Sequence, residues 1–126
     1  MIRPATEADM PAVWALYSDA CDAMLGTPYD CEWVMGVHPT REGLLASVRA
    51  GNLFVACESD GSATKDGATS SLLGAYVLNG EQTSGYENAA WPVDARPDEV
   101  AVIHLLVTAT QARGRGVARS MLAHAA

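Results

Sequence analysis

The sequence LLVTATQARGRGVARSML, residues 105–122, joins an apolar run to a helical pattern through a turn that is rich in glycine and arginine. The run that leads into it, residues 99–108, is apolar at almost every position, which is typical of a buried strand. After the turn, Val117, Met121 and Leu122 recur at helical spacing. We therefore expect a central strand, covered on both faces, that leads through a short loop into a helix.

This turn has the chemistry of an anion-binding site. The first backbone N–H groups of a helix have no partner inside the helix, and the helix dipole is positive there. Gly114 and Gly116 would let a phosphate approach the backbone, while Arg113, Arg115 and Arg119 add positive charge. The dipole contributes about 0.3–1 kcal/mol to such binding. The alternative is an ordinary solvated loop between a strand and a helix.

Two common phosphate-binding motifs do not fit the turn. A P-loop requires a Gly-Lys pair, and the sequence contains none. A dinucleotide fingerprint, G-x-G-x-x-[GA], fails because Arg119 occupies its last position and no acidic residue follows. The phosphate ligand must therefore be of another kind.

The distribution of charge favours a small anionic ligand over nucleic acid. The net charge is -7, and all fifteen acidic residues lie at or before Glu99. The first 99 residues carry five basic side chains and a net charge of -10, whereas the last 27 carry three arginines and no acid. Nucleic-acid binding needs an extended basic face, which an acidic body opposes. A small basic patch suits a compact anion, and the acidic surface attracts cations.

The rest of the chain predicts one domain, residues 1–126, with the order strand, helix, helix, strand, strand, strand, helix. A helix after a Thr6–Asp9 capping pair would bury a stripe and stop at residues 26–28. The stripe contains Met10, Val13, Trp14, Tyr17, Cys21, Met24 and Leu25. A second helix is expected over 40–50, with Gly51 at its C-terminal end. The remaining strands are expected at 1–6, 52–58 and 72–80, and polar or glycine-rich loops connect them.

Length and composition predict a cytoplasmic protein with no membrane segment. A chain of 126 residues, 49% of them hydrophobic, is long enough to bury a core. No apolar run approaches the roughly 20 residues of a membrane-spanning helix, and the N-terminus lacks a signal peptide's apolar region. The three cysteines have no C-x-x-C spacing, so we expect thiols rather than disulfides or structural zinc.

The turn also fits the pattern [QR]-x-x-G-x-[GA], as RGRGVA at residues 113–118. In its setting of strand and helix, this resembles the acetyl-CoA signature of the GNAT superfamily of N-acetyltransferases. The opening IRPATEADMPAVWALY, the order of the elements and the tract AVIHLLVTATQARGRGVARSML resemble the same family. The resemblance implies an α/β (α+β) fold with a mixed, mostly antiparallel sheet that helices flank.

The resemblance also implies how acetyl-CoA, the expected cosubstrate, would bind without a metal. Backbone groups of Leu105, Leu106 and Val107 would pair with the pantetheine arm, and a backbone N–H of His104 or Leu106 would stabilise the thioester oxyanion. Backbone amides at the start of the last helix would hold the pyrophosphate; these belong to Arg113, Gly114, Arg115, Gly116, Val117, Ala118 and Arg119.

Acetyl transfer by direct attack needs a neutral amine, whereas a lysine-like amine has a pKa of about 10.4, so a base must accept a proton. Glu99 is the first candidate, and a solvated strand end is its alternative role. His104 is the second, with a core imidazole as the alternative. Charge alone suggests that a cationic substrate meets an acidic loop that contains Tyr86, Asp94 and Asp98.

In the resembled family another strand, a helix and usually two more strands follow the last helix, so we expect a fold that is truncated at its C-terminus. Three hypotheses follow. In the first, the chain is an acetyltransferase for a small-molecule or peptide amine. A partner protein completes its site, or a second copy of the chain does so in a homodimer that forms through the exposed sheet edge. Alternatively, it is a truncated acetyltransferase of low activity. The third is a non-enzymatic module that binds acyl-CoA, or nothing, and serves in assembly.

Overall fold

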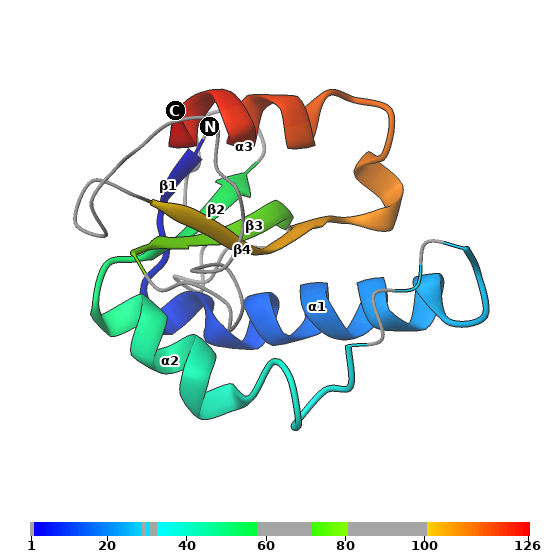
Figure 1. Ribbon diagram of the computed structural model, residues 1–126, viewed down its shortest axis with the longest axis horizontal. Helices are drawn as coiled ribbons and strands as arrows, with labels where there is room; N and C mark the ends of the chain where they lie inside the picture. The colour runs from blue at the N-terminus through cyan, green and yellow to red at the C-terminus, as the bar shows by residue number, and fades with distance from the viewer. Residues whose placement is uncertain (1, 29, 31–32, 58–71, 81–100) are drawn as a thin grey trace, which may run out of the picture.

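The computed structural model describes residues 2–28, 30, 33–57, 72–80 and 101–126 (Figure 1). Short 3-10 helices occupy Glu7–Asp9 and Thr110–Ala112. The strands and helices follow the predicted order: β1 (Ile2–Pro4), α1 (Met10–Met24), α2 (Arg41–Arg49), β2 (Leu53–Cys57), β3 (Leu72–Asn79), β4 (Val102–Thr108) and α3 (Val117–Ala125).

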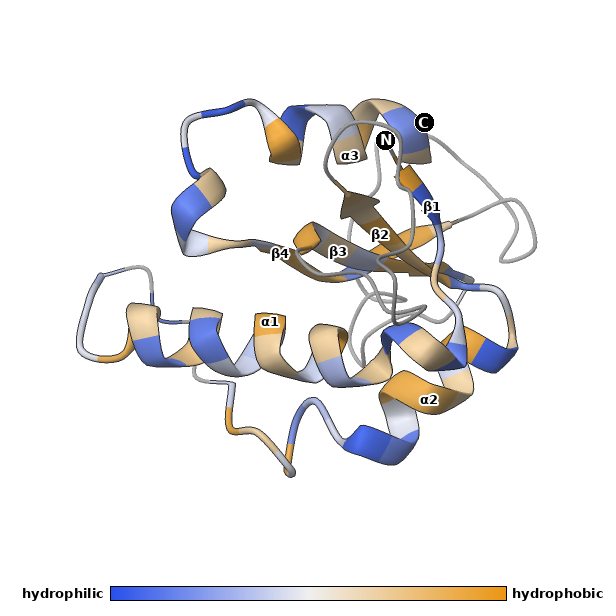
Figure 2. Ribbon diagram, turned by 180° about the vertical axis from the view of Figure 1, so that it is seen from behind, coloured by the Kyte–Doolittle hydropathy of each residue, from blue (hydrophilic) through white to orange (hydrophobic). Residues whose placement is uncertain are grey.

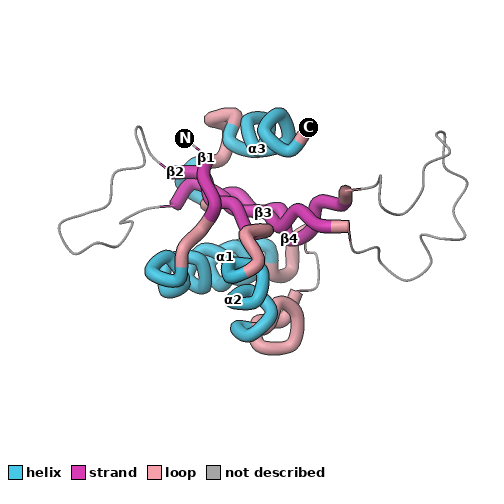
Figure 3. Tube along the Cα trace, turned by 90° about the vertical axis from the view of Figure 1, so that its left-hand side faces the viewer, coloured by secondary structure: helices cyan, strands magenta, loops and turns pink. Residues whose placement is uncertain are grey.

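The four strands form one sheet in the order β1-β2-β3-β4, and every pairing is antiparallel. Helices α1 and α2 cover one face of this sheet, and α3 covers the other (Figures 1 and 3). Figure 2 shows apolar residues on the strands and on the helices that cover them. The predicted α+β fold, with a mostly antiparallel sheet flanked by helices, is therefore confirmed.

The strand at residues 99–108 differs from its prediction. Helices α1 and α3 both contact β4, so its two faces are covered as expected. It is not central, however, because it is the outermost strand of the sheet that the structure describes. Val107 is the one buried residue of β4, and the others are half-buried. The apolar run thus correctly indicated that both faces of the strand are covered. It carries no information on whether the strand has neighbours on both edges.

The link from β1 to α1 depends on a buried carboxylate. Asp9 is only 2% exposed. Its carboxylate accepts two hydrogen bonds from the Arg3 guanidinium, at 2.7 and 3.0 Å, and one from the Thr6 backbone N–H at 2.7 Å. A buried charge is tolerated when it is paired and hydrogen-bonded in this way. The predicted Thr6–Asp9 capping pair is confirmed, with Arg3 as a partner that the sequence did not reveal.

Helix α2 begins and ends as predicted. The Thr40 side chain caps it by accepting a hydrogen bond from the Gly43 N–H at 2.9 Å, and Leu44 and Val48 face the core. Gly51 follows with φ of +77°, in the left-handed region that glycine adopts without strain. A Cβ at this glycine would meet nothing within 4 Å, so Gly51 serves only the end of the helix.

The buried faces of α1 and α3 are narrower than predicted. Helix α1 ends before Leu25, which is 75% exposed, and Leu122 on α3 is 48% exposed, so both were misassigned to buried stripes. An α-helix turns by about 100° per residue, which rotates Leu122 away from the face that Val117 and Met121 share. The buried residues of α1 are Met10, Val13, Leu16, Tyr17 and Ala20.

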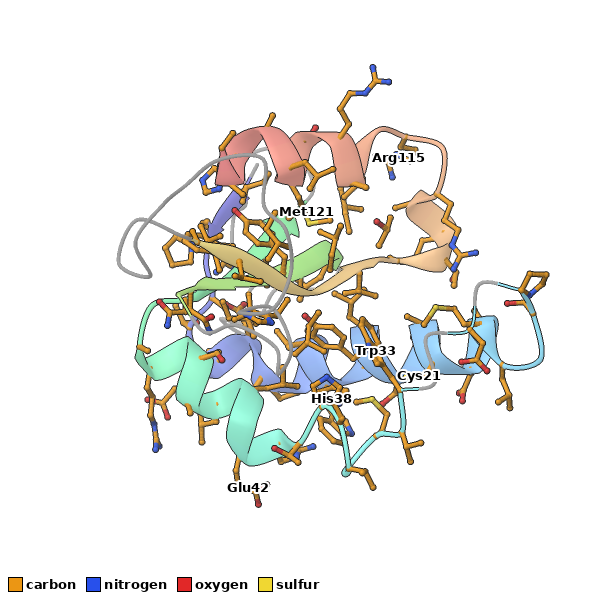
Figure 4. The ribbon with its side chains drawn as sticks, viewed as in Figure 1. Cys21, Trp33, His38, Glu42, Arg115 and Met121 are labelled. Carbon is orange, nitrogen blue, oxygen red and sulfur yellow. The ribbon has the colours of Figure 1, made fainter. Side chains whose placement is uncertain are left out.

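Helix α3 packs closely on the sheet at one glycine. A Cβ on Gly74 of β3 would lie 2.7 Å from the Val107 carbonyl oxygen and 2.8 Å from Cε of Met121. Figure 4 shows Met121 pointing from α3 to the sheet. Near the far end of α3, the Tyr76 hydroxyl lies 2.6 Å from Nδ1 of His124. Glycine at position 74 therefore sets how near α3 and β4 approach β3.

Some features are absent from the described ranges. No described helix is both long and apolar enough to cross a bilayer. The described side chains also include no group of three or more His, Cys, Asp or Glu residues placed to hold a metal ion. Cys21 and Cys57 are both thiols, and Cys31 lies outside the described residues.

Candidate functional site

The turn between β4 and α3 depends on two glycines. Gly114 and Gly116 have φ values of +82° and +78°, a backbone conformation that L-residues other than glycine rarely adopt. A Cβ at either glycine would meet nothing within 4 Å. Unlike Gly74, they lie beside open space. The turn therefore presents bare backbone at its surface.

The start of α3 has uncapped backbone donors. Gly116 is the N-cap residue and has no side chain that could accept a hydrogen bond. The Ser120 N–H donates to the Gly116 carbonyl oxygen at 3.0 Å, and this is the first bond of the helical ladder. The amides of Val117, Ala118 and Arg119 precede it, where the helix supplies no acceptor. These N–H groups and the positive end of the dipole suit an anion.

The three arginines of the turn are all exposed. Arg113 comes just before the two glycines and lines the cavity described below. Arg115 lies on the turn (Figure 4), and its backbone N–H donates to the Ala112 carbonyl oxygen at 3.2 Å. Arg119 is in the first turn of α3. Positive side chains thus flank the bare backbone.

A cavity of about 340 Å³ adjoins the turn. It lies between the second half of α1, the connector after α1, the end of β4 and the start of α3. Most of its lining is apolar, with Arg113 as its charged member among the described residues. The lining residues are Ala20, Met24, Trp33, Leu106, Val107, Thr108, Ala112, Arg113, Gly114, Val117 and Ala118.

Six residues predicted to bind the cofactor line this cavity: Leu106, Val107, Arg113, Gly114, Val117 and Ala118. The other four, Leu105, Arg115, Gly116 and Arg119, do not line it. Sequence reasoning missed Trp33, which Figure 4 shows in the space between α1 and β4. The connector that holds Trp33 has no apolar periodicity that could have indicated its position.

Strand β4 carries a bulge next to the cavity. Val107 pairs with Ala75 and His104 with Val77, so Leu105 and Leu106 together lie opposite one residue of β3. Leu105 has a φ of +53°. Bulges bend a strand and occur frequently next to active sites. Here the turn lies at one end of the cavity and the bulge lies at the other end, along β4.

A second cavity, of about 200 Å³, lies along the first half of β4. The α2 start and the connector before it form its other side. Its lining residues are His38, Pro39, Thr40, Gly43, Leu44, Ser47, Val77, Asn79, His104 and Leu105. Leu105 lines this cavity and Leu106 lines the first, so the bulge contributes to the walls of both cavities.

The predicted catalytic residues have different outcomes. His104 is half-buried in the second cavity, and its Nε2 lies 3.0 Å from Oδ1 of Asn79. An amide oxygen only accepts, so this contact places the proton of a neutral imidazole on Nε2. Glu99 lies outside the described residues, as do the acidic-loop residues Tyr86, Asp94 and Asp98.

The fold is similar to that of a solved structure. A protein from Staphylococcus aureus Mu50, described as a "putative acetyltransferase", matches with a TM-score of 0.69 and 21% sequence identity. The match covers 98% of this chain and 68% of that protein. No family model and no curated protein matches the sequence. At this identity the likeness shows the fold alone.

Proposed function

We propose that this protein is an acetyl-CoA-dependent N-acetyltransferase of the GNAT type, which transfers an acetyl group to a primary amine of a small molecule or peptide. One observation carries the proposal: a cavity extends from the uncapped start of α3 along β4 to a bulge. Acetyl-CoA carries a pyrophosphate, an extended arm and a thioester in this order. They would occupy the helix start, the cavity along β4 and the bulge, respectively.

The turn provides what a pyrophosphate requires. The backbone amides of Val117, Ala118 and Arg119 would donate hydrogen bonds, and the open space at Gly114 and Gly116 would admit the phosphate oxygens. Exposed arginines would add charge-assisted contacts. The residues present therefore fit an anionic cosubstrate, and the charge of this segment is opposite in sign to that of the rest of the chain.

The apolar part of the cavity suits the pantetheine arm. Met24 and Trp33 form one side, and Leu106 and Val107 of β4 form the other. Because β4 is outermost among the described strands, its backbone could pair with an extended arm as it would with another strand. The same edge could alternatively pair with a second copy of the chain, which we keep as a proposal for the oligomeric state.

The acetyl group would lie at the bulge, and the amine would approach from the second cavity. The amine nitrogen attacks the thioester carbonyl carbon, a C–N bond forms, and the C–S bond breaks to release the CoA thiolate. The nitrogen loses a proton to a base, and the thiolate takes up a proton. A backbone N–H of β4 would stabilise the oxyanion formed during this step.

His104 and Glu99 remain the candidate bases. His104 lines the second cavity, which would place its imidazole on the side from which the amine approaches. Its imidazole would accept the proton, directly or through water. For Glu99 the proposal rests on its position at the start of the strand region of residues 99–108.

The proposal is tested by assaying release of CoA from acetyl-CoA with a panel of primary amines, while mass spectrometry identifies the acetylated product. We expect amine-dependent release by the natural protein and at least a tenfold loss of kcat/KM, or about 1.4 kcal/mol, in Gly116→Trp. Gly51→Trp is the matched control, because Gly51 has a similar φ of +77° and equally open space. Equal activity of the two variants would contradict the phosphate site.

A further inference from the structure

Leu105 has a backbone conformation that its side chain disfavours. Its φ of +53° is the only positive value at a non-glycine position within the described ranges. A branched residue in this region is a strained exception that persists only when its surroundings hold it there. The conformation occurs at the bulge, which contributes to the walls of both cavities. Another group must therefore hold this peptide in place.

The group in contact with it is the Tyr17 hydroxyl, which donates a hydrogen bond to the Leu105 carbonyl oxygen at 2.7 Å. Tyr17 belongs to α1 and is 0% exposed. Its ring packs edge-on against Trp33, with 5.9 Å between ring centroids. The hydroxyl is thus fixed by a helix and a packed ring, away from solvent.

The hydrogen bond has a consequence for the next residue. The peptide bond between Leu105 and Leu106 is trans, so the Leu105 carbonyl and the Leu106 N–H point in opposite directions in one plane. When Tyr17 fixes the carbonyl towards α1, it also fixes the Leu106 N–H to point away from α1. Leu106 lines the cavity that would hold the acetyl-CoA arm, and this cavity extends past β4 to the start of α3, on the opposite side of the sheet from α1.

We propose that Tyr17 is a positioning residue that holds the Leu105–Leu106 peptide and thereby aims the Leu106 N–H at the thioester oxygen. This inference rests on the proposed function and selects Leu106 over His104 as the oxyanion donor. Tyr17 itself touches neither substrate. It acts only through the direction of the peptide.

The test compares Tyr17→Phe with Tyr76→Phe. Each change removes one hydroxyl from a tyrosine that is 0% exposed, but the Tyr76 hydroxyl contacts His124 on α3 instead of the bulge. For Tyr17→Phe we expect kcat to fall by about ten- to a hundredfold, with the acetyl-CoA dissociation constant within about twofold of the natural protein. For Tyr76→Phe we expect both to stay within about twofold. Equal kcat in the two variants would overturn the proposal.

Hydrogen exchange of the ligand-free protein separates this inference from the proposed function. Tyr17→Phe should speed amide exchange in β4 at residues 104–107 by about tenfold or more, relative to the β2–β3 pairing, whereas Tyr76→Phe should not. If the natural protein neither binds nor uses acetyl-CoA, the proposed function fails, and the exchange data still decide whether Tyr17 holds the peptide. Unchanged exchange at residues 104–107 would overturn the inference.

A double variant covers the case in which Tyr17→Phe does not fold. Glycine adopts a φ of +53° without strain, so Leu105→Gly removes the need for a group that holds the peptide. In the Leu105→Gly background, Tyr17→Phe should fold and should increase exchange less than it does alone. A double variant that stays unfolded, or an undiminished effect of Tyr17→Phe in this background, would contradict a role in holding the bulge.

Discussion

Two glycines next to α3, Gly74 on the sheet beneath it and Gly116 at its start, are needed for opposite reasons. At the seam where α3 meets the sheet, Gly74 is needed because a Cβ would lie 2.7 Å from the Val107 carbonyl oxygen. At the turn that begins α3, Gly116 is needed because its φ is +78°, and a Cβ there would meet nothing within 4 Å. The first glycine brings protein groups together, while the second leaves open space beside the backbone.

This difference shows how α3 can be packed firmly against the sheet while the turn at its start stays exposed. Met121 packs at the seam and fixes α3 against β3, so the start of the helix is held at a defined place next to β4. The turn itself adds little to packing, which leaves its amides and arginines at the surface. We therefore expect changes at the seam to affect stability, and changes at the turn to affect binding.

The largest effect on stability is expected for Gly74→Ala. The added methyl group would overlap a backbone oxygen, which moves only with the strand, so the free energy of unfolding should fall by about 2–3 kcal/mol. Urea unfolding measures this loss. Adding Met121→Ala removes the other neighbour of the methyl group and leaves the Val107 contact in place. If the double variant loses no more stability than the cavity left by Met121→Ala accounts for, the contact with the Val107 backbone is unimportant.

A smaller effect is expected for Gly116→Ala. A side chain at a φ of +78° costs about 1 kcal/mol of strain, with no steric overlap to add to it. Gly51→Ala, at +77° and beside equally open space, should cost the same amount. Thermal or urea unfolding of both variants checks this equality. A loss at Gly116 as large as that at Gly74 would remove the distinction between seam and turn.

Near neutral pH, the smallest expected effect on stability comes from the ionisation of buried groups. These groups lie in the core and not in the turn. Burial raises the pKa of Tyr17, of Tyr76 and of Cys57 above their ordinary values. The unfolded chain ionises these groups from about pH 8.5–10, and the folded chain keeps them protonated to higher pH. Their contribution to stability is therefore complete below about pH 8 and declines as pH rises through the unfolded values.

Urea midpoints measured at pH 7, 9 and 10.5 test this expectation. The midpoint should be flat between pH 7 and about 8, and should then fall. Tyr76→Phe removes one ionising group and should make the fall shallower, while Gly116→Ala should not change its slope. A midpoint that rises with alkaline pH would contradict the burial of these groups.

The sequence predicted the order of the elements and the turn, because each has a local signal. Apolar spacing marked α2 and apolar runs marked the strands, the Thr6–Asp9 pair marked the start of α1, and the glycines Gly114 and Gly116 marked the turn. These features depend on neighbours in the chain. They appear in the structure close to the expected positions.

The bulge and its support could not be predicted, because they depend on residues that are distant in sequence. Tyr17 and Leu105 are 88 positions apart, and nothing in either residue type indicates their hydrogen bond. Leucine disfavours a positive φ, so propensity pointed away from the observed conformation. Trp33 lies in a connector without periodicity, and the outermost position of β4 is a property of the sheet, which its own apolar run does not encode.

The most direct test of the central claim, that the turn at the start of α3 binds acetyl-CoA, is a calorimetric titration with this ligand, with the mass of the protein in solution determined alongside. We predict a dissociation constant in the micromolar range for the natural protein and for Gly51→Trp, and no detectable binding for Gly116→Trp. Absence of binding by the folded natural protein, or an unchanged affinity in Gly116→Trp, would contradict the claim.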